Sequence, residues 1–280
     1  MLEPLQEEFM RRAIAEMVLL GLAGGAIGCW VVLYEFSYAA ESLAHSIFPG
    51  LVVASMAGVP LLVGAAPAVL VAAVAIALVG RVPGLGREVG VAVVVTTMFG
   101  LGVLLALSPD APPGIQELLF GDILGPTDAD LIAAAALVAV TVVALRLLHA
   151  RLLATGFDRA SAAALGLSPA LVDAALLALL AGAIVVAVQG LGNLLVVAAF
   201  VGPAATARNL SDRIGPMIAI AAATAVVAGV GGLYLSYYAG TAGGASVALA
   251  ILAAYLLSLP VRPLLARRAA SRPGVEATIG

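Results

Sequence analysis

The sequence predicts an all-α, polytopic membrane protein of about nine transmembrane helices, with its N-terminus outside the cell and its C-terminus in the cytoplasm. Of its 280 residues, 63% are hydrophobic and only 10% are charged. A soluble domain of this size needs far more charge on its surface. The apolar residues gather in runs near twenty residues, and the arginines gather in alternate loops. In lipid, such runs must be helical because helices satisfy their own backbone groups.

The nine runs form one transmembrane domain that covers residues 1–280. The predicted spans are 14–34, 38–58, 60–80, 88–108, 130–149, 170–189, 193–209, 214–238 and 244–261. Residues 1–13 are expected to form an N-terminal segment at the membrane interface, since Leu5, Phe9 and Ile14 can share one face of a helix. A frayed polar terminus is the alternative. The glycine runs at 21–28 and 229–232 predict closely packed helix pairs.

The second span contains the most informative polar residues, Glu41 and His45. Ionisable groups inside a span are costly and usually mark a pathway or a structural pair. A spacing of four places both on one helix face, where a carboxylate and an imidazole can share a divalent cation. A buried hydrogen-bonded pair that fixes helix packing is the other interpretation. Two ligands are an incomplete site, and candidates by residue type for the others are Ser37, Ser42, Thr96, Thr97 and Asn193.

Arginine determines the predicted orientation, because the chain has no lysine. Alternate loops and the tail hold eleven of the thirteen arginines: 81, 87, 146, 151, 159, 208, 213, 262, 267, 268 and 272. The positive-inside rule places these loops in the cytoplasm, together with a tail at 262–280. The polar segment 108–130 falls on the opposite side and carries the acidic residues Asp110, Glu117, Asp122, Asp128 and Asp130.

The cytoplasmic loop at 150–169 contains a second distinctive pattern. Phe157 and Asp158 precede a short run of strong helix formers that Gly166 closes. Ser168 and Pro169 then supply the cap and first turn of the next span. The pattern predicts a short helix on which another protein docks, with a simple amphipathic connector as the alternative. Three further polar residues, Asp173, Gln189 and Asn193, are interpreted as helix-end groups, and His149 as a residue of the cytoplasmic face.

Several classes of protein are excluded by missing motifs. A phosphate-binding loop of the GxxxxGK[ST] type requires lysine, so any ATP hydrolysis must belong to a separate chain. The sequence also lacks a GxSxG elbow, a CxxC pair and an HExxH helix. The chain is therefore predicted to be a transport subunit and not an enzyme. A net charge of -3 does not favour nucleic acid as a partner.

Four segments, in order along the chain, resemble those of a known family. They are AESLAHSIFPG at 40–50, LLFGDILGPTDADL at 118–131, FDRASAAALG at 157–166 and LLVVAAFVGPAATAR at 194–208. Together they resemble the ABC-3 family, the membrane permeases of bacterial zinc, manganese and iron ABC importers. The resemblance implies a multi-pass protein of the bacterial cell membrane that imports a divalent metal ion, with no permanently bound cofactor.

The resemblance also implies partners and site residues. The partners are a cytoplasmic ABC ATPase, an extracytoplasmic metal-binding protein and a second permease copy that forms a homodimer. Glu41 and His45 take the positions of the family's metal-binding aspartate and histidine. The residues implied for coupling to the ATPase are Phe157, Asp158, Arg159, Ala164 and Gly166. The chain departs from the family pattern at Glu41, at Ala44 where serine is common, and at Gly240 and Ala242, which replace an aspartate and a proline.

Two other transport functions remain open from the sequence. A permease for a metal chelate or a vitamin would share the coupling loop but need a wider, less charged cavity. A proton-coupled secondary transporter often has a membrane acid pair and inverted repeats. The sequence alone does not identify which metal is carried.

Overall fold

The computed structural model describes residues 3–79, 87–109, 111–112, 114–115 and 117–261. Within these ranges all regular structure is helical, and no strand occurs. The predicted tail at 262–280, and Arg81 in the loop before the fourth span, lie outside the described residues. The elements are η1 (Pro4–Gln6), α1 (Glu8–Leu33), α2 (Ser37–Ala57), α3 (Leu61–Val79), α4 (Arg87–Ala106), α5 (Glu117–Phe120), α6 (Asp128–Phe157), α7 (Arg159–Ala164), α8 (Pro169–Leu191), α9 (Val196–Leu210), α10 (Ile214–Ala239) and α11 (Gly243–Ser258).

Each predicted span falls on one long helix, but two helices extend beyond the predicted limits. Helix α1 begins at Glu8, inside the segment expected at the interface, because Met10 and Ala13 are fully buried against the rest of the bundle. Helix α6 continues to Phe157 and so includes the first part of the predicted loop. No glycine or proline interrupts α6 until Gly156, so nothing in its sequence stops the helix earlier.

Five helical stretches are long and apolar enough to cross a bilayer on their own, among the residues that the structure describes. They are α1, residues 89–106 of α4, α6, α8 and α10. Large apolar side chains on these helices are also exposed, such as Leu104 (69% exposed) and Leu147 (75%). An all-helical, multi-pass architecture is thereby confirmed. The count of nine crossings and the sides of the two termini stay predictions.

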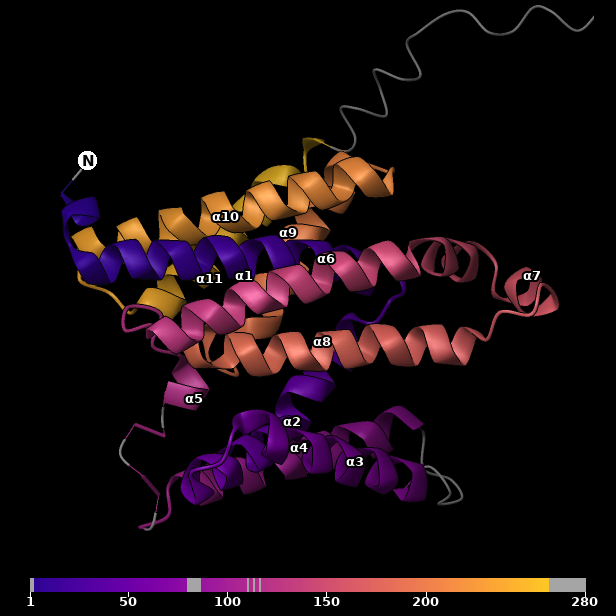
Figure 1. The fold of residues 1–280 in the computed structure, drawn as a ribbon, viewed down its shortest axis with the longest axis horizontal. Helices are drawn as coiled ribbons and strands as arrows, with labels where there is room; N and C mark the ends of the chain where they lie inside the picture. Colours follow the sequence, from indigo (N-terminus) through magenta and orange to yellow (C-terminus); the bar gives the residue numbers. More distant parts are fainter. Residues whose placement is uncertain (1–2, 80–86, 110, 113, 116, 262–280) are drawn as a thin grey trace, which may run out of the picture.

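The helices form two groups that meet around α2 and α8 (Figure 1). In the larger group, α1 packs against α10, α9 and α6, and α11 covers α9 and α10. In the smaller group, α2 packs against α3 and α4. The N-terminus and α5 lie at one end of the molecule, here called the N-terminal end, and α7 lies at the other, here called the α7 end (Figure 1).

The glycine run of α1 forms the predicted close helix contact. A Cβ on Gly28 would overlap the backbone carbonyl of Phe200 in α9, and one on Gly25 would lie 2.7 Å from the backbone of Ala222 in α10. Only glycine lets three backbones approach this closely. The prediction of a tight seam at 21–28 is therefore confirmed, and the seam fixes α9 and α10 around α1.

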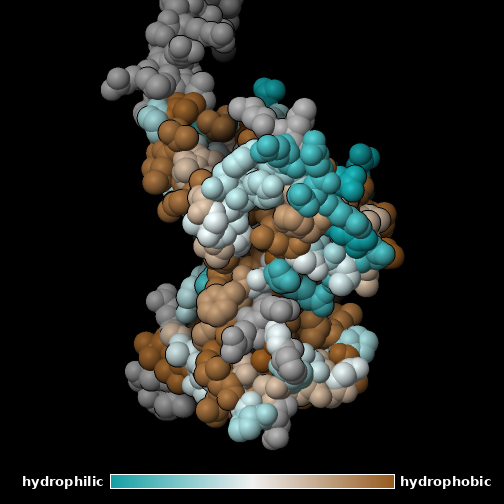
Figure 2. Space-filling model, turned by 90° about the vertical axis from the view of Figure 1, so that its left-hand side faces the viewer, coloured by the Kyte–Doolittle hydropathy of each residue, from teal (hydrophilic) through white to brown (hydrophobic). Residues whose placement is uncertain are grey.

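Figure 2 shows the N-terminal end in face view. Hydrophilic side chains gather on one part of this end, and hydrophobic side chains cover much of the remaining surface (Figure 2). Extensive apolar surface on a single chain indicates contact with lipid or with another protein.

Candidate functional site

Glu41 and His45 contact each other on one face of α2. Glu41 Oε1 lies 3.1 Å from His45 Nε2, and the two residues are one helical turn apart. The Glu41 side chain is 51% exposed, whereas that of His45 is 21% exposed. The pair thus has a partly buried imidazole and a carboxylate that opens outward. The geometry allows both groups to bind one cation, and it equally allows a hydrogen bond from Nε2–H to the carboxylate.

The second nitrogen of His45 contacts Asn193, which is buried in the turn between α8 and α9. Asn193 Nδ2 lies 3.4 Å from His45 Nδ1, so its amide donates when the ring proton is on Nε2. Asn193 Oδ1 is buried and has no hydrogen-bond partner among the described residues. A flipped amide would present this oxygen to an Nδ1–H group. Asn193 can therefore support either tautomer, including the one that leaves Nε2 free for a metal.

Two further features shape the surroundings of His45. The Phe99 ring of α4 packs against the imidazole, with ring centroids 4.6 Å apart. Pro49 lies inside α2 and has no amide hydrogen, so the backbone carbonyl of His45 lacks its usual helical donor. That carbonyl is a further oxygen close to the pair.

Asn193 is held in place by two segments that cross at short distance, residues 118–122 and 189–194. The Asn193 amide N–H donates to the Leu118 carbonyl at 2.9 Å, and the Asp122 N–H donates to the Gln189 carbonyl at 3.0 Å. Gly121 (φ +78°) and Gly192 (φ +74°) adopt left-handed backbone, and a Cβ on either would overlap the other segment. The crossing therefore requires glycine at both positions.

We expect Gly192→Ala to destabilise the protein and to weaken the site. The added Cβ would overlap the backbone of residues 119–121 at a positive φ, which costs on the order of 1–3 kcal/mol and displaces Asn193 from His45. A lower thermal unfolding temperature in detergent would report the change. Gly182→Ala in α8 is the matched control, because a Cβ there meets no neighbouring atom within 4 Å. An unchanged unfolding temperature for Gly192→Ala would contradict the expectation.

Glu41 also lines a groove on the outside of the bundle. The groove has a volume of about 450 Å³ and is formed by α2, α9 and α11. Its lining residues are Ser37, Glu41, Leu194, Val197, Ala198, Val201, Gly202, Ala205, Ala248, Ile251, Leu252 and Tyr255. Apart from Ser37, Glu41 and the Tyr255 hydroxyl, these side chains are apolar or absent. Glu41 is thus the charged group on an otherwise hydrophobic surface.

The remaining candidates by residue type do not complete a metal site. Of these, Ser37 lines the groove beside Glu41. Ser42, Thr96 and Thr97 make no side-chain hydrogen bond to the pair in the part of the chain that is described. The described residues also contain no group of three or more His, Cys, Asp or Glu side chains placed to hold a metal ion. Further ligands would have to be the backbone, Asn193, water or a second chain.

The predicted short helix is present at the α7 end. Asp158 ends α6 and caps α7, where its carboxylate accepts from the Ala160 N–H (2.9 Å), the Ser161 N–H (3.2 Å) and the Ser161 hydroxyl. The Ser161 hydroxyl and these amides hold the pKa of the Asp158 carboxyl below its usual value. Gly166 follows with a φ of +81°, and Ser168 caps α8 as predicted. Local sequence therefore determines this loop.

Arg159 anchors α7 to α8 through Asp173. Its two terminal nitrogens lie 2.9 and 2.8 Å from the two carboxylate oxygens, which is a bidentate pair. The guanidinium also lies 5.8 Å from the ring centre of Tyr34, whose hydroxyl donates to the Leu152 carbonyl at 2.7 Å. Asp173 was interpreted as a helix-end group, and its pairing with Arg159 was not foreseen. Many helices have an acidic residue in their first turns after a loop that contains arginine. This pattern is too common to predict the Arg159–Asp173 pair.

Tyr34 connects the α7 end to the helix that holds the candidate metal pair. It ends α1, and Glu35, with a φ of +59°, forms the turn that leads into α2. Phe157 (95% exposed) and Leu165 (80% exposed) leave an apolar surface on and beside α7. Ala164 and Gly166 are exposed as well. The loop thus has an anchored side that faces the bundle and an apolar side that faces outward.

Comparison with known proteins gives a consistent result. The ABC 3 transport family matches residues 6–262. The chelated iron transport system membrane protein YfeC of Yersinia pestis is 32% identical over 250 residues, 89% of this chain and 85% of that protein. The manganese transport system membrane protein MntC of Listeria monocytogenes is 29% identical over 88% of each chain. A chain of PsaBC from Streptococcus pneumoniae, solved in complex with Fab, superposes with a TM-score of 0.89 at 26% identity, covering 95% of this chain and 98% of that one.

Proposed function

This chain belongs to the ABC 3 transport family, and on that premise we propose that it is the permease subunit of an ATP-driven importer of divalent transition-metal ions. The observation that carries the proposal is the Glu41–His45 pair, with its carboxylate open to a surface groove and its imidazole supported by Asn193. Relatives of this length and similarity are named for manganese and iron transport. Such a protein is a multi-pass component of a bacterial membrane.

The proposed orientation follows from the arginine distribution. All nine long helices cross the membrane, the N-terminal end faces outward and the α7 end faces the cytoplasm. An ABC ATPase then docks on α7 and its flanks through Phe157, Asp158, Arg159, Ala164 and Gly166. The exposed apolar side chains beside α7 support docking, because a short alanine-rich helix in water has little reason to expose them.

The pair is proposed to hold the ion only transiently. Nε2 of His45 and one oxygen of Glu41 bind the cation, while the His45 proton moves to Nδ1 and Asn193 turns its oxygen toward it. Two protein ligands plus water bind weakly enough to release the ion onward. Imidazole and carboxylate together suit manganese, iron and zinc. Glu41 is one methylene longer than the family's aspartate, which shifts its carboxylate by about a bond length.

A second permease copy is proposed to cover the groove of α2, α9 and α11. The groove is mostly apolar, yet it contains the half-exposed Glu41. A carboxylate that faces lipid is costly, whereas one that faces a pathway between two copies is not. A homodimer would bring two Glu41–His45 pairs to the same passage. An extracytoplasmic metal-binding protein would deliver the ion to the N-terminal end of this dimer.

The proposal is tested by transport in proteoliposomes. The chain is purified with its native ATPase, reconstituted with the delivery protein, and supplied with Mn²⁺, Fe²⁺ or Zn²⁺ with and without ATP. We expect metal to accumulate only with ATP, measured by elemental analysis of the vesicles. Accumulation by the chain alone under a proton gradient would instead show a secondary transporter.

A metal chelate is the second candidate cargo, because YfeC is named for chelated iron. The same vesicles distinguish the two when free ion and chelate compete. If free Mn²⁺ or Fe²⁺ fails to reduce uptake of the chelate, the chelate is the cargo. If free ion abolishes it, the ion itself is bound by the permease.

A further inference from the structure

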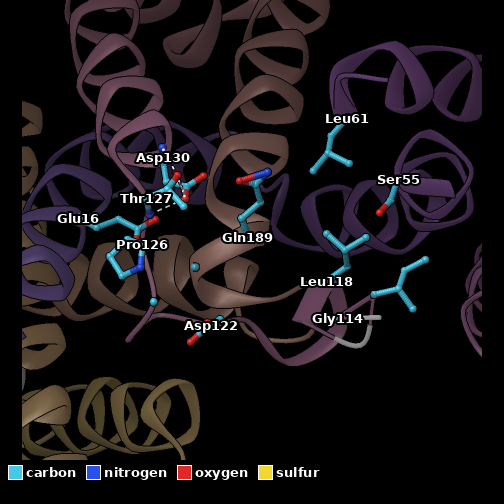
Figure 3. A pocket seen from close by; sticks show the side chains of 13 residues that line it. Glu16, Ser55, Leu61, Gly114, Leu118, Asp122, Pro126, Thr127, Asp130 and Gln189 are labelled. Atoms are coloured by element: carbon cyan, nitrogen blue, oxygen red, sulfur yellow. Dashed lines mark hydrogen bonds between the residues drawn. The ribbon is translucent and has the colours of Figure 1, made fainter. Parts of the chain in front are cut away.

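A second cavity with acidic walls lies at the N-terminal end, away from the Glu41–His45 pair. It has a volume of about 300 Å³; α1, α6, α8 and the segment that leads into α6 line one side, and Ser55 of α2, Leu61 of α3 and Leu118 of α5 line the other (Figure 3). We propose that this cavity, here called the acidic vestibule, binds a hydrated divalent cation. Its defining residues are Glu16, Asp122, Asp130 and Gln189, together with Thr127.

Glu16 is the residue that points to a ligand. It belongs to α1, is only 2% exposed, and lines the vestibule. Its Oε2 atom is buried and accepts no hydrogen bond from any described residue. A buried carboxylate oxygen without a partner is costly, and no basic side chain among the described residues pairs with Glu16. A positive ligand in the cavity would supply the missing interaction.

Other oxygens surround the same space. Figure 3 shows Glu16, Asp130 and Gln189 around it, contributed by α1, α6 and α8. Asp130 is held by a capping box: its Oδ2 accepts from the Thr127 N–H (2.8 Å) and hydroxyl (2.6 Å), so Oδ1 stays available. Asp122 adds a third carboxylate to the lining. A donor set made only of oxygens suits Mn²⁺, Mg²⁺ and Ca²⁺.

The charge balance around the vestibule is negative. Arg12 is the nearest described arginine along α1, and it is already paired with Asp128 at 2.8 Å and with Glu8 at 3.1 Å. It does not line the cavity. Glu16, Asp122 and Asp130 therefore line the cavity without a basic side chain in the described lining. This arrangement attracts a cation and repels anions.

The size of the cavity indicates that the ion keeps its water. No three of the described acidic, histidine or cysteine side chains are close enough to bind a bare ion. A water molecule takes about 30 Å³, so the vestibule has room for several around a central ion. A small, hard ion such as Mg²⁺ gives up water reluctantly, and acidic residues then bind it through that shell.

The vestibule and the metal pair are connected by one short turn. Gln189 lines the vestibule, and Asn193, four residues later, contacts His45. The glycine crossing at 121 and 192 holds this turn rigidly. An ion that leaves the vestibule would thus pass close to Asn193, which contacts His45. Only this ordering of the two sites rests on the proposed function; cation binding in the vestibule does not.

The test measures Mn²⁺ binding to the full chain purified with its ATPase, by loss of the free Mn²⁺ electron paramagnetic resonance signal. A Glu41→Ala, His45→Ala background removes the inner pair, so remaining Mn²⁺ binding reports the vestibule. We expect Glu16→Gln in this background to weaken that binding at least tenfold, and Asp122→Asn, at an exposed position, to weaken it severalfold. Hyperfine spectra in deuterated water should show that the bound Mn²⁺ keeps most of its water.

The matched control is Glu7→Gln, which removes an equal charge from an exposed position just before α1. It should leave Mn²⁺ binding unchanged. Equal Mn²⁺ binding in Glu16→Gln and its parent would overturn the proposal and leave Glu16 as a protonated structural group. So would the absence of any Mn²⁺ binding in the background variant, or bound Mn²⁺ that has lost most of its water. The proposed function is tested separately by ATP-driven uptake, and none of these Mn²⁺-binding results would contradict it.

Discussion

Glu41→Ala and His45→Ala should each reduce ATP-driven metal uptake by about a hundredfold or more, since even residues that only support a metal ligand change affinity by 10–100-fold. Each variant removes one of the two side chains, 3.1 Å apart, that are positioned to share the ion. Uptake of Mn²⁺ into proteoliposomes, followed by elemental analysis, measures the effect. Neither residue belongs to the α7 end, so co-purification with the ATPase should be unchanged.

Glu35→Gln is the matched control for this experiment. Glu35 is an exposed acid in the turn just before α2, and it forms no ion pair or side-chain hydrogen bond with any described residue. Its substitution should leave uptake close to that of the parent, whereas Glu41→Gln should behave like Glu41→Ala. Normal uptake in both Glu41→Ala and His45→Ala would show that the pair only fixes helix packing.

The second large effect is expected at the α7 end. Asp158→Arg removes the carboxylate that caps α7, which is worth about 1 kcal/mol, and places a positive charge at the positive end of that helix. Gly166→Pro forbids the φ of +81° and removes the N–H that donates to the Ala163 carbonyl at 3.0 Å. Both variants should still assemble in the membrane, yet transport per ATP hydrolysed should fall sharply.

The measurement compares the ATPase rate with metal uptake in the same vesicles. Asp158→Asn is the conservative control, because asparagine is also a strong N-cap and should preserve coupling. If Asp158→Arg leaves the ratio of metal uptake to ATP hydrolysis unchanged, the cap does not position α7 for coupling. Loss of ATPase binding in Asp158→Arg but not in Asp158→Asn would support docking at this loop.

Much of the fold was accessible from the sequence because helices in lipid are specified locally. Each apolar run forms a helix where predicted, and residue type alone identified the cap at Ser168 and the short helix after Asp158. The boundaries of α1 and α6 could not be predicted as well from the sequence. The start of α1 depends on the burial of Met10 and Ala13 against other helices, and no local pattern encodes that burial.

Only half of the candidate site could be predicted from the sequence. Glu41 and His45 share a helix face because their spacing of four guarantees it. Asn193 was one of several possible ligands by type, and nothing in its sequence context selected it over Ser42, Thr96 or Thr97. The structure places Asn193 beside His45, which is 148 residues away in the sequence. The close crossing of the segments that contain Gly121 and Gly192 makes this contact possible. The sequence does not predict a role for Glu16, because no local pattern encodes its burial.

By itself, the sequence determined that the chain folds in hydrocarbon, where its helices run, and that Glu41 and His45 share one face of α2. Hydrocarbon demands internal hydrogen bonding, and a helix fixes which residues share a face. The tertiary structure alone decided which distant groups meet: Asn193 with His45, Arg159 with Asp173, and Glu16 with the vestibule. These meetings depend on how closely helices approach, and glycine contacts between remote segments set that approach. Short-range spacing carries no information about such contacts.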